Sequence, residues 1–287
     1  MKRISESELI INPDGSVYHL GLNPGDLAAT VLTVGDPERV ELVSRMMDDV
    51  YFTKNSREFV THTGRIANKD ISVISTGIGT DNIDIVLNEI DALVNVDFGS
   101  RTENKIHKSL NIIRLGTTGL IQPNAQVDQI LLSELAIDAS GLSPWYNFEQ
   151  TEEEKDWRDK LDVSFPKQQW SVHASNKDLL NHFSQQFDKG ITYTASGFYG
   201  PQGRHIRVNP NPKNMLEILA SITLRNQKID NIEMETAGIY GLAKVLGHRA
   251  LAINAALANR TDGKFSANPA ATVEKMIEQT FELLETL

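Results

Sequence analysis

The chain has 287 residues, of which 40% are hydrophobic and 23% charged, as in an ordinary globular protein. The net charge of −10 argues against binding nucleic acid in bulk, and the lack of cysteine excludes disulfides, zinc–thiolate sites and cysteine nucleophiles. No apolar run has the length of a membrane span, and residues 1–8 lack the apolar core of a secretory signal, so we expect a cytoplasmic protein with no membrane partner.

The first predicted unit is a strand that runs into a helix. Residues 1–14 are polar, and we expect them to be loosely ordered. The β-branched run 29–34 predicts a strand that ends at Gly35, and Pro37 is typical of a helix N-terminus. The free N–H groups of such an N-terminus favour an anion, and Arg39 falls in the first turn. Taken alone, this motif more often marks a capped helix with no ligand.

Two further strands are predicted before residue 110. Residues 56–61 alternate in polarity as a strand does, and residues 71–76 form a strong apolar strand that ends at Gly77. Residues 83–94 then carry an apolar stripe at helical spacing. Residues 97–109 are polar and contain no motif, so we expect a loop.

The most informative stretch is residues 112–119, where an apolar run leads into Arg114 and then into glycines and threonines. This pattern predicts a buried strand that ends in a tight turn. Arg114 offers a positive fork suited to phosphate or carboxylate, and Thr117 and Thr118 offer hydroxyl donors. The alternative is an ordinary strand and turn with Arg114 in a surface ion pair.

The middle of the chain continues the alternation of strands and helices. Residues 129–137 and 191–196 predict strands, residues 151–162 an exposed helix or linker, and residues 176–180 a capped helix start. Residues 197–204 form a loop rich in Gly and Pro, which is either a surface turn or a pocket for a planar base. The side chains that suit a base are Phe198, Gln202 and Arg204.

The last segment contains two glutamates in apolar surroundings. Glu233 and Glu235 precede a predicted helix, and carboxylates in such a context are costly unless they are paired, which points to function. Residues 249–258 predict a central strand, and a final helix begins at Pro269. We therefore expect one α/β domain over residues 1–287, with a mixed sheet between helices and ligands at the strand ends.

Taken together, these motifs resemble the nucleoside phosphorylase superfamily of the hexameric type, and most of all bacterial uridine phosphorylases. The likeness runs from about residue 17 to the C-terminus. Each motif is short, but all of them occur in family order. They are His19-Leu20-Gly21-Leu22, Gly35-Asp36-Pro37-Glu38-Arg39-Val40, Ser56-Arg57-Glu58-Phe59, Ser75-Thr76-Gly77-Ile78-Gly79, Arg114-Leu115-Gly116-Thr117-Thr118-Gly119, Gln202-Gly203-Arg204, Glu233-Met234-Glu235 and Asn259-Arg260-Thr261.

The resemblance implies a role for individual residues and a distorted, barrel-like sheet. Phosphate is expected at Gly35, Arg39, Arg114 and Thr117, with Arg57 reaching it across a subunit interface. Ribose is expected at Thr117, Met234 and Glu235, with His19 supplied by the neighbouring subunit. Phe198, Gln202 and Arg204 are expected to hold the base, with Arg260 supporting Arg204. The residues expected to act in catalysis are Arg114, Gln202, Arg204 and Arg260.

The implied activity is phosphate-dependent cleavage of uridine, with deoxyuridine or thymidine as further candidate substrates. Inorganic phosphate is the expected co-substrate, and no organic cofactor is needed. The expected assembly is a homodimer or a homohexamer with active sites shared across the dimer interface. Purine members carry an aspartate where this chain has Asn259, and an amide cannot act as an acid. The alternatives are a purine nucleoside phosphorylase and a non-catalytic nucleoside-binding relative.

The chain departs from the family pattern at several places. In relatives a monovalent cation lies between subunits, and the resemblance implies potassium near Glu58, Ile78 and Asn82. However, Thr80-Asp81-Asn82 stands where bacterial members read Gly-Pro-Ser, and Gly200-Pro201 reverses the family's order. Residues 98–108 and 144–169 are longer than is usual in the family. We expect these segments to reshape the pocket or the oligomer surface.

Overall fold

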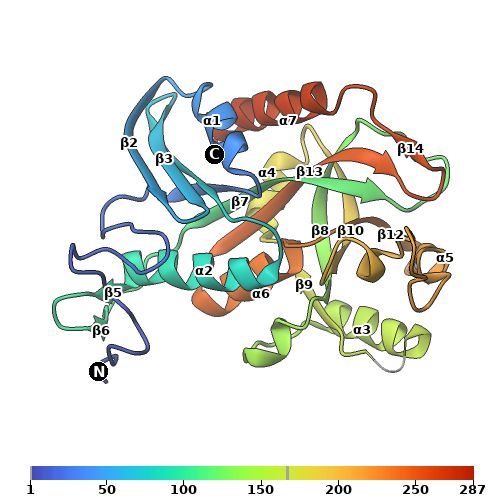
Figure 1. The fold of residues 1–287 in the computed structure, drawn as a ribbon, viewed down its shortest axis with the longest axis horizontal. Helices are drawn as coiled ribbons and strands as arrows, with labels where there is room; N and C mark the ends of the chain where they lie inside the picture. Colours follow the sequence, from blue (N-terminus) through green and yellow to red (C-terminus); the bar gives the residue numbers. More distant parts are fainter. Residues whose placement is uncertain (1, 166–167) are drawn as a thin grey trace.

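The computed structural model describes residues 2–165 and 168–287, whose course is shown in Figure 1. In this part of the chain, no helix combines the length and apolarity needed to cross a bilayer. The strands form one large central sheet with helices on its outer faces, in addition to a small separate hairpin (Figure 1). The predicted α/β class with a mixed, barrel-like sheet is confirmed.

The N-terminal part supplies an open layer of the sheet. β1 pairs in parallel with β4 and with β7, and β4 continues antiparallel into β3 and β2. The elements in this part are β1 (Thr30–Val34), α1 (Pro37–Ser44), β2 (Asp49–Ser56), β3 (Phe59–Ile66), β4 (Lys69–Ser75), α2 (Thr80–Asn95), β5 (Val96–Asp97), β6 (Thr102–Glu103) and β7 (Asn111–Leu120).

The C-terminal part closes the sheet on itself. β7, β13, β8, β10 and β12 pair in that order, and β12 returns to β7, which makes the ring complete. The elements here are β8 (Ile130–Ala139), α3 (Glu152–Ser164), β9 (Ser171–Ala174), α4 (Lys177–Phe183), β10 (Asp188–Ala195), α5 (Met215–Ser221), β11 (Thr223–Leu224), β12 (Gln227–Glu233), α6 (Thr236–Leu246), β13 (Arg249–Asn259), β14 (Lys264–Phe265) and α7 (Pro269–Leu284), with short 3₁₀ turns at Ser143–Trp145 and Gly200–Gln202.

β7 changes its neighbour halfway along its length. One edge pairs with β13 throughout, but the other pairs with β1 up to Arg114 and with β12 only at Gly119 and Leu120. Among the described residues, no strand pairs with the intervening residues on that edge. Such a switch between neighbouring strands leaves a crevice at the strand ends, where α/β proteins bind ligands.

Helices cover the sheet through apolar faces that match the predicted spacing. In Figure 1, α1 and α7 lie on one side of the sheet and α2 and α6 on the other. The predicted helix starts at Asn176 and Pro269 are confirmed by α4 and α7. α3 is capped by Thr151, but it is not simply exposed, because Trp157 and Leu161 are buried on its inner face.

Two local predictions were wrong. Residues 56–61 do not form one strand, because Arg57 adopts a positive φ of 54° and the chain turns there from β2 into β3. Residues 97–109 are not wholly a loop, since they contain most of the β5–β6 hairpin. Near the N-terminus, Arg101 donates from its side chain to the carbonyls of Ile4, Ser5 and Leu9.

Candidate active site

Arg114 lies at the centre of a buried ionic cluster. Its side chain is 7% exposed, and Nη2 contacts a carboxylate oxygen of Glu235 and lies 3.5 Å from Glu233. Nη1 donates to Asn254 Oδ1 at 3.1 Å. Burial opposes the positive charge, but the two carboxylates outweigh it and raise the pKa of Arg114. The alternative of a surface ion pair for Arg114 is therefore wrong.

Gly116 provides the space in which the Arg114 guanidinium lies. The predicted turn at this glycine was wrong, because β7 continues to Leu120. Side chains two residues apart on a strand point to the same face, and a Cβ on Gly116 would overlap Arg114 Nη1. Glycine is required here for a close approach rather than for a bend. Thr117 follows in the crevice edge of β7 and is half-buried.

Glu235 is held from two directions. One carboxylate oxygen accepts from the Gly79 backbone N–H at 2.7 Å, and the other contacts Arg114. Burial raises the pKa of Glu235 against the opposing effect of Arg114, and the nearby carboxylate of Glu233 adds to the rise. Met234, the neighbour of Glu235, is half-buried. The structure thus brings Glu235 and Arg114 together, as the sequence predicts.

Glu233 fixes the backbone that carries Glu235. Its carboxylate accepts the backbone N–H groups of Glu235 and Thr236 at 2.9 to 3.2 Å, and the Thr194 hydroxyl at 2.6 Å. A buried carboxylate at the first N–H groups of α6 also matches the positive end of the helix dipole. The sequence identifies Glu233 as a carboxylate in apolar surroundings. It does not predict that this carboxylate accepts the first backbone N–H groups of α6.

Arg39 adds a second guanidinium to the cluster. Asp36 caps α1 by accepting from the backbone N–H of Glu38 at 2.9 Å, which sets the turn after Gly35. Arg39 Nη1 donates to the carbonyl of Leu115 at 3.3 Å, on β7 in the crevice. Burial and the repulsion from Arg114 lower the pKa of Arg39. Two nearby cations that repel each other form a local site suited to an anion.

The residues predicted for the base lie together on one loop. The Arg204 guanidinium carbon is 3.5 Å from the centre of the Phe198 ring, and Nη1 donates to the Phe198 carbonyl and to Gln202 Oε1. Gln202 is buried, whereas Phe198 is 51% exposed. Burial and the charge of Arg260 lower the pKa of Arg204 to about 10. Arg260 therefore lies within electrostatic reach of Arg204.

His19 and Arg57 form a separate surface cluster. His19 Nδ1 lies 2.6 Å from Glu89 Oε1, and its carbonyl accepts from the Ser56 hydroxyl at 2.6 Å. Arg57 lies over the Tyr18 ring at 4.8 Å. Within the described residues, neither side chain hydrogen bonds to the Arg114 cluster. The two residues are close to each other, since Ser56 and Tyr18 beside them connect the two segments.

Asn259 is fully occupied in shaping the backbone. It is buried, its Nδ2 donates to the carbonyls of Gln122 and Ala125, and its Oδ1 accepts from the N–H groups of Thr261 and Asp262. Asp262 in turn accepts from the backbone of Asn124 at 3.2 Å. The same carboxylate accepts from Asn259 Nδ2 at 3.3 Å, and Asn259 itself is an amide that cannot act as an acid.

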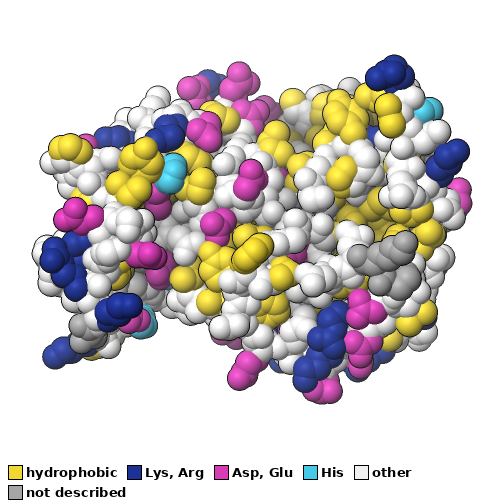
Figure 2. Space-filling view, turned by 60° about the horizontal axis from the view of Figure 1, so that its bottom comes forward, with side chains coloured by type: hydrophobic (Ala, Val, Ile, Leu, Met, Phe, Trp, Pro, Cys, Tyr) yellow, Lys and Arg dark blue, Asp and Glu magenta, His cyan; other side chains and the backbone are white. Residues whose placement is uncertain are grey.

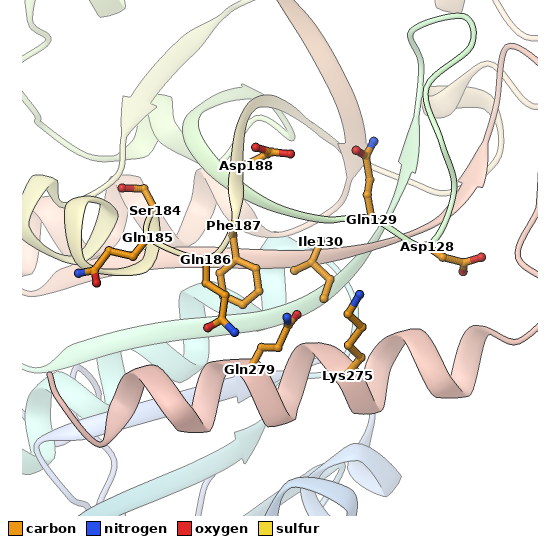
Figure 3. Close-up of a pocket in the computed structure, with 10 residues that line it drawn as sticks. All are labelled: Asp128, Gln129, Ile130, Ser184, Gln185, Gln186, Phe187, Asp188, Lys275 and Gln279. Carbon is orange, nitrogen blue, oxygen red and sulfur yellow. The ribbon is translucent and has the colours of Figure 1, made fainter.

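The surface of the molecule is mixed in character. Figure 2 shows apolar side chains in patches, with acidic and basic side chains interspersed around them. Ile78, Phe198 and Tyr199 are exposed large apolar side chains next to the residues described above. A separate hollow of about 370 Å³ (Figure 3) is lined by Gln129, Asp188 and Lys275, among others. It lies at the starts of β8 and β10 and contains none of the predicted site residues.

Comparisons with known proteins show what the chain is similar to. The family described as "Phosphorylase superfamily" matches residues 29–287. A uridine phosphorylase of Thermococcus kodakarensis is 31% identical, covering 88% of this chain and 80% of that protein. One from Escherichia coli is 28% identical, covering 85% and 87%. A Trypanosoma brucei nucleoside phosphorylase, whose crystal structure is described as showing uridine phosphorylase activity, aligns with a TM-score of 0.89 at 28% identity, over 97% of this chain and 100% of that one.

Proposed function

This chain belongs to the phosphorylase superfamily, and we propose that it is a uridine phosphorylase, which cleaves uridine with inorganic phosphate to uracil and ribose 1-phosphate. The observation that carries the proposal is the buried cluster of Arg114, Glu235 and Arg39 at the crevice of β7. It joins a cationic site for phosphate to a carboxylate for sugar hydroxyls. Phosphate is the co-substrate, and no organic cofactor takes part.

Phosphate is proposed to bind against Arg39 and Arg114, with Gly35 and Thr117 at its sides. Two guanidiniums neutralise the dianion and aim one oxygen at C1′ of the sugar. Met234 is placed beneath the ribose, and Glu235 accepts from its hydroxyls. Phe198 stacks on uracil, while Gln202 and Arg204 contact O2, N3 and O4, with Arg260 behind Arg204.

The reaction forms one bond as another breaks. A phosphate oxygen bonds to C1′ while the C1′–N1 bond breaks. The electron pair of the C1′–N1 bond passes to the uracil ring. In the transition state the ribose carries positive charge, as in other glycosyl transfers, and the negative phosphate stabilises this positive charge. Arg204 and Gln202 stabilise the charge that develops on uracil. The proton lost by phosphate ends on uracil.

The base specificity is tested by comparing uridine with inosine. Because Asn259 is an amide, which hydrogen bonds to nearby backbone groups and to the Asp262 carboxylate, it cannot itself supply a proton to a purine. We expect kcat/KM for uridine to exceed that for inosine by roughly two orders of magnitude or more. A preference for inosine would keep the phosphate site and overturn the base assignment in favour of a purine nucleoside phosphorylase.

We propose that each active site is completed by a second copy of the chain. His19 and Arg57 lie together at the surface, and within the described residues neither side chain hydrogen bonds to Arg114 of its own subunit, which supports a role in a partner's site. His19 is proposed to reach the 5′-hydroxyl and Arg57 the phosphate. The smallest active form is then a homodimer, alone or within a homohexamer.

The shared site predicts that two inactive variants rescue each other. R57A and R114A are each expected to be inactive as pure proteins. Co-expressed in equal amounts they give hybrid dimers for about half of the molecules, each with one intact site, so about a quarter of the parent activity should return. Activity is measured on the purified mixture. No recovery from verified hybrids would contradict the shared site.

We propose that potassium binds between the two copies near Glu58 and Ile78. Carboxylate and carbonyl oxygens suit such a hard cation, and both residues are exposed. The amide of Asn82 instead lies against Gly77 in its own loop. Within the described residues no cluster of three or more His, Cys, Asp or Glu could hold a metal, so one subunit offers few donors. Exchange of potassium for choline at equal ionic strength should lower kcat, and an unchanged rate would exclude the ion.

A further inference from the structure

Asn254 is a buried amide in an apolar strand. Residues 250–258 are otherwise made of Ala, Leu and Ile, and Asn254 in their midst is fully buried. A buried amide costs free energy unless its donors and acceptor find partners. Its partners therefore show why the strand carries it, and neither the sequence analysis nor the comparisons assign it a role.

The partners of Asn254 form a chain of hydrogen bonds across the closed ring. Oδ1 accepts from Arg114 Nη1 at 3.1 Å, and Nδ2 donates to Ser133 Oγ at 3.0 Å. Ser133 Oγ lies 2.5 Å from Thr192 Oγ1. Asn254, Ser133 and Thr192 are each fully buried. The chain links β7, β13, β8 and β10, so it ties the Arg114 side chain to the framework of the ring.

The chemistry of the partners fixes the orientation of the amide. Arginine has only donors, so the atom that faces Arg114 must be the oxygen of Asn254. The NH₂ group then points to Ser133, whose hydroxyl accepts from it. A flip of the amide would place two donors against each other at the Arg114 end. Asn254 therefore presents a fixed acceptor to one side of the guanidinium.

The neutrality of this acceptor matters as much as its direction. Arg114 Nη2 already faces two carboxylates, Glu235 and Glu233, which draw the guanidinium toward themselves. A third partner on Nη1 resists rotation into a two-pronged pair with Glu235. An amide supplies that partner without further negative charge beside a site for a dianion.

We propose that Asn254 is a positioning residue, which holds the Arg114 guanidinium in the direction needed for phosphate without cancelling its charge. This role rests on the proposed function, in which Arg114 binds phosphate. It predicts that the affinity for phosphate depends on the identity of residue 254 even when the protein remains folded.

The test uses the full-length protein with inorganic phosphate as the probe. Isothermal titration calorimetry measures phosphate binding to the parent, N254A and N254D, and circular dichroism verifies their folding. N254A removes the acceptor, and we expect about tenfold weaker binding. N254D keeps the shape and an acceptor but adds a charge, so it is expected to bind at least as weakly. T192V is the matched control: it removes a buried hydroxyl at the far end of the chain and should change binding less than twofold.

The outcomes separate this inference from the proposed function. In steady-state assays N254A and N254D should raise KM for phosphate more than KM for uridine. Parent-like phosphate binding in a folded N254D would leave Asn254 a purely structural role and overturn the inference, as would an equal loss in T192V. A parent that binds no phosphate would instead overturn the proposed function itself, and this inference with it.

Discussion

R114A is expected to lower kcat/KM for the phosphorolysis of uridine by about 10³-fold or more. The substitution removes a buried charge that is proposed to orient phosphate and to stabilise its charge in the transition state, and the loss of a single such donor costs about 10² to 10³ in rate. Here a full guanidinium is lost together with its hold on Glu235. The measurement is steady-state formation of uracil at saturating and limiting phosphate.

The same substitution leaves Glu233 and Glu235 buried without their cation. Breaking a buried pair costs about 3–5 kcal/mol, so the unfolding of R114A must be followed beside its activity. R39A offers a milder test of the phosphate site, because Arg39 is only half-buried and forms no buried ion pair. R45A is the matched control: Arg45 pairs with Glu41 on the exposed face of α1 and should leave kcat/KM unchanged. Near-normal turnover in folded R114A would refute the phosphate assignment.

E235Q should lower kcat/KM for uridine by roughly 10²- to 10³-fold. Glutamine matches glutamate in shape, but it loses the charge that accepts from the ribose hydroxyls and faces the positive sugar in the transition state. The variant also relieves Arg114 of one carboxylate, so phosphate binding should be retained or strengthened. Kinetics and phosphate calorimetry on one preparation measure both effects.

The opposite directions of the two effects make E235Q diagnostic. E41Q is the matched control, since Glu41 is an exposed carboxylate at the surface. A kcat/KM of E235Q equal to that of the parent would contradict the proposed role of Glu235 in binding ribose. A parallel loss of phosphate binding would show instead that the whole cluster had collapsed.

Much of the fold could be predicted from local patterns in the sequence. Apolar spacing predicted α2 and α7, and the central strand β13 was predicted from a long apolar run. These elements follow from periodicity because each buries one face or is buried throughout. Ring closure between β7 and β12 joins residues more than a hundred positions apart, and no local pattern encodes such a contact.

The wrong predictions share a physical cause: a glycine or a charged residue can have several structural roles, and the local sequence does not distinguish them. The sequence pattern predicts a turn at Gly116. In the structure Gly116 lies within β7, where its lack of a side chain leaves room for the side chain of Arg114, two residues earlier. Arg57 and its neighbours alternate like a strand, but a left-handed residue turns them into a hairpin. Both cases depend on what packs against the backbone.

The candidate site was predicted in part. Family order placed Arg114, Arg39 and Glu235, and the structure brings these three together. Asn254 was missed, although a single amide in an apolar strand was a visible signal. Its significance became clear only when Arg114 was found beside it. Buried polar side chains in otherwise apolar strands merit the same scrutiny as glutamates.

The most direct test of the account is release of uracil from uridine with and without inorganic phosphate. Release is expected to depend on phosphate and to yield ribose 1-phosphate in equal amount to uracil. Release of uracil and free ribose without phosphate would identify a hydrolase and contradict the proposed reaction. Binding of uridine with no release in either case would identify a non-catalytic nucleoside-binding protein.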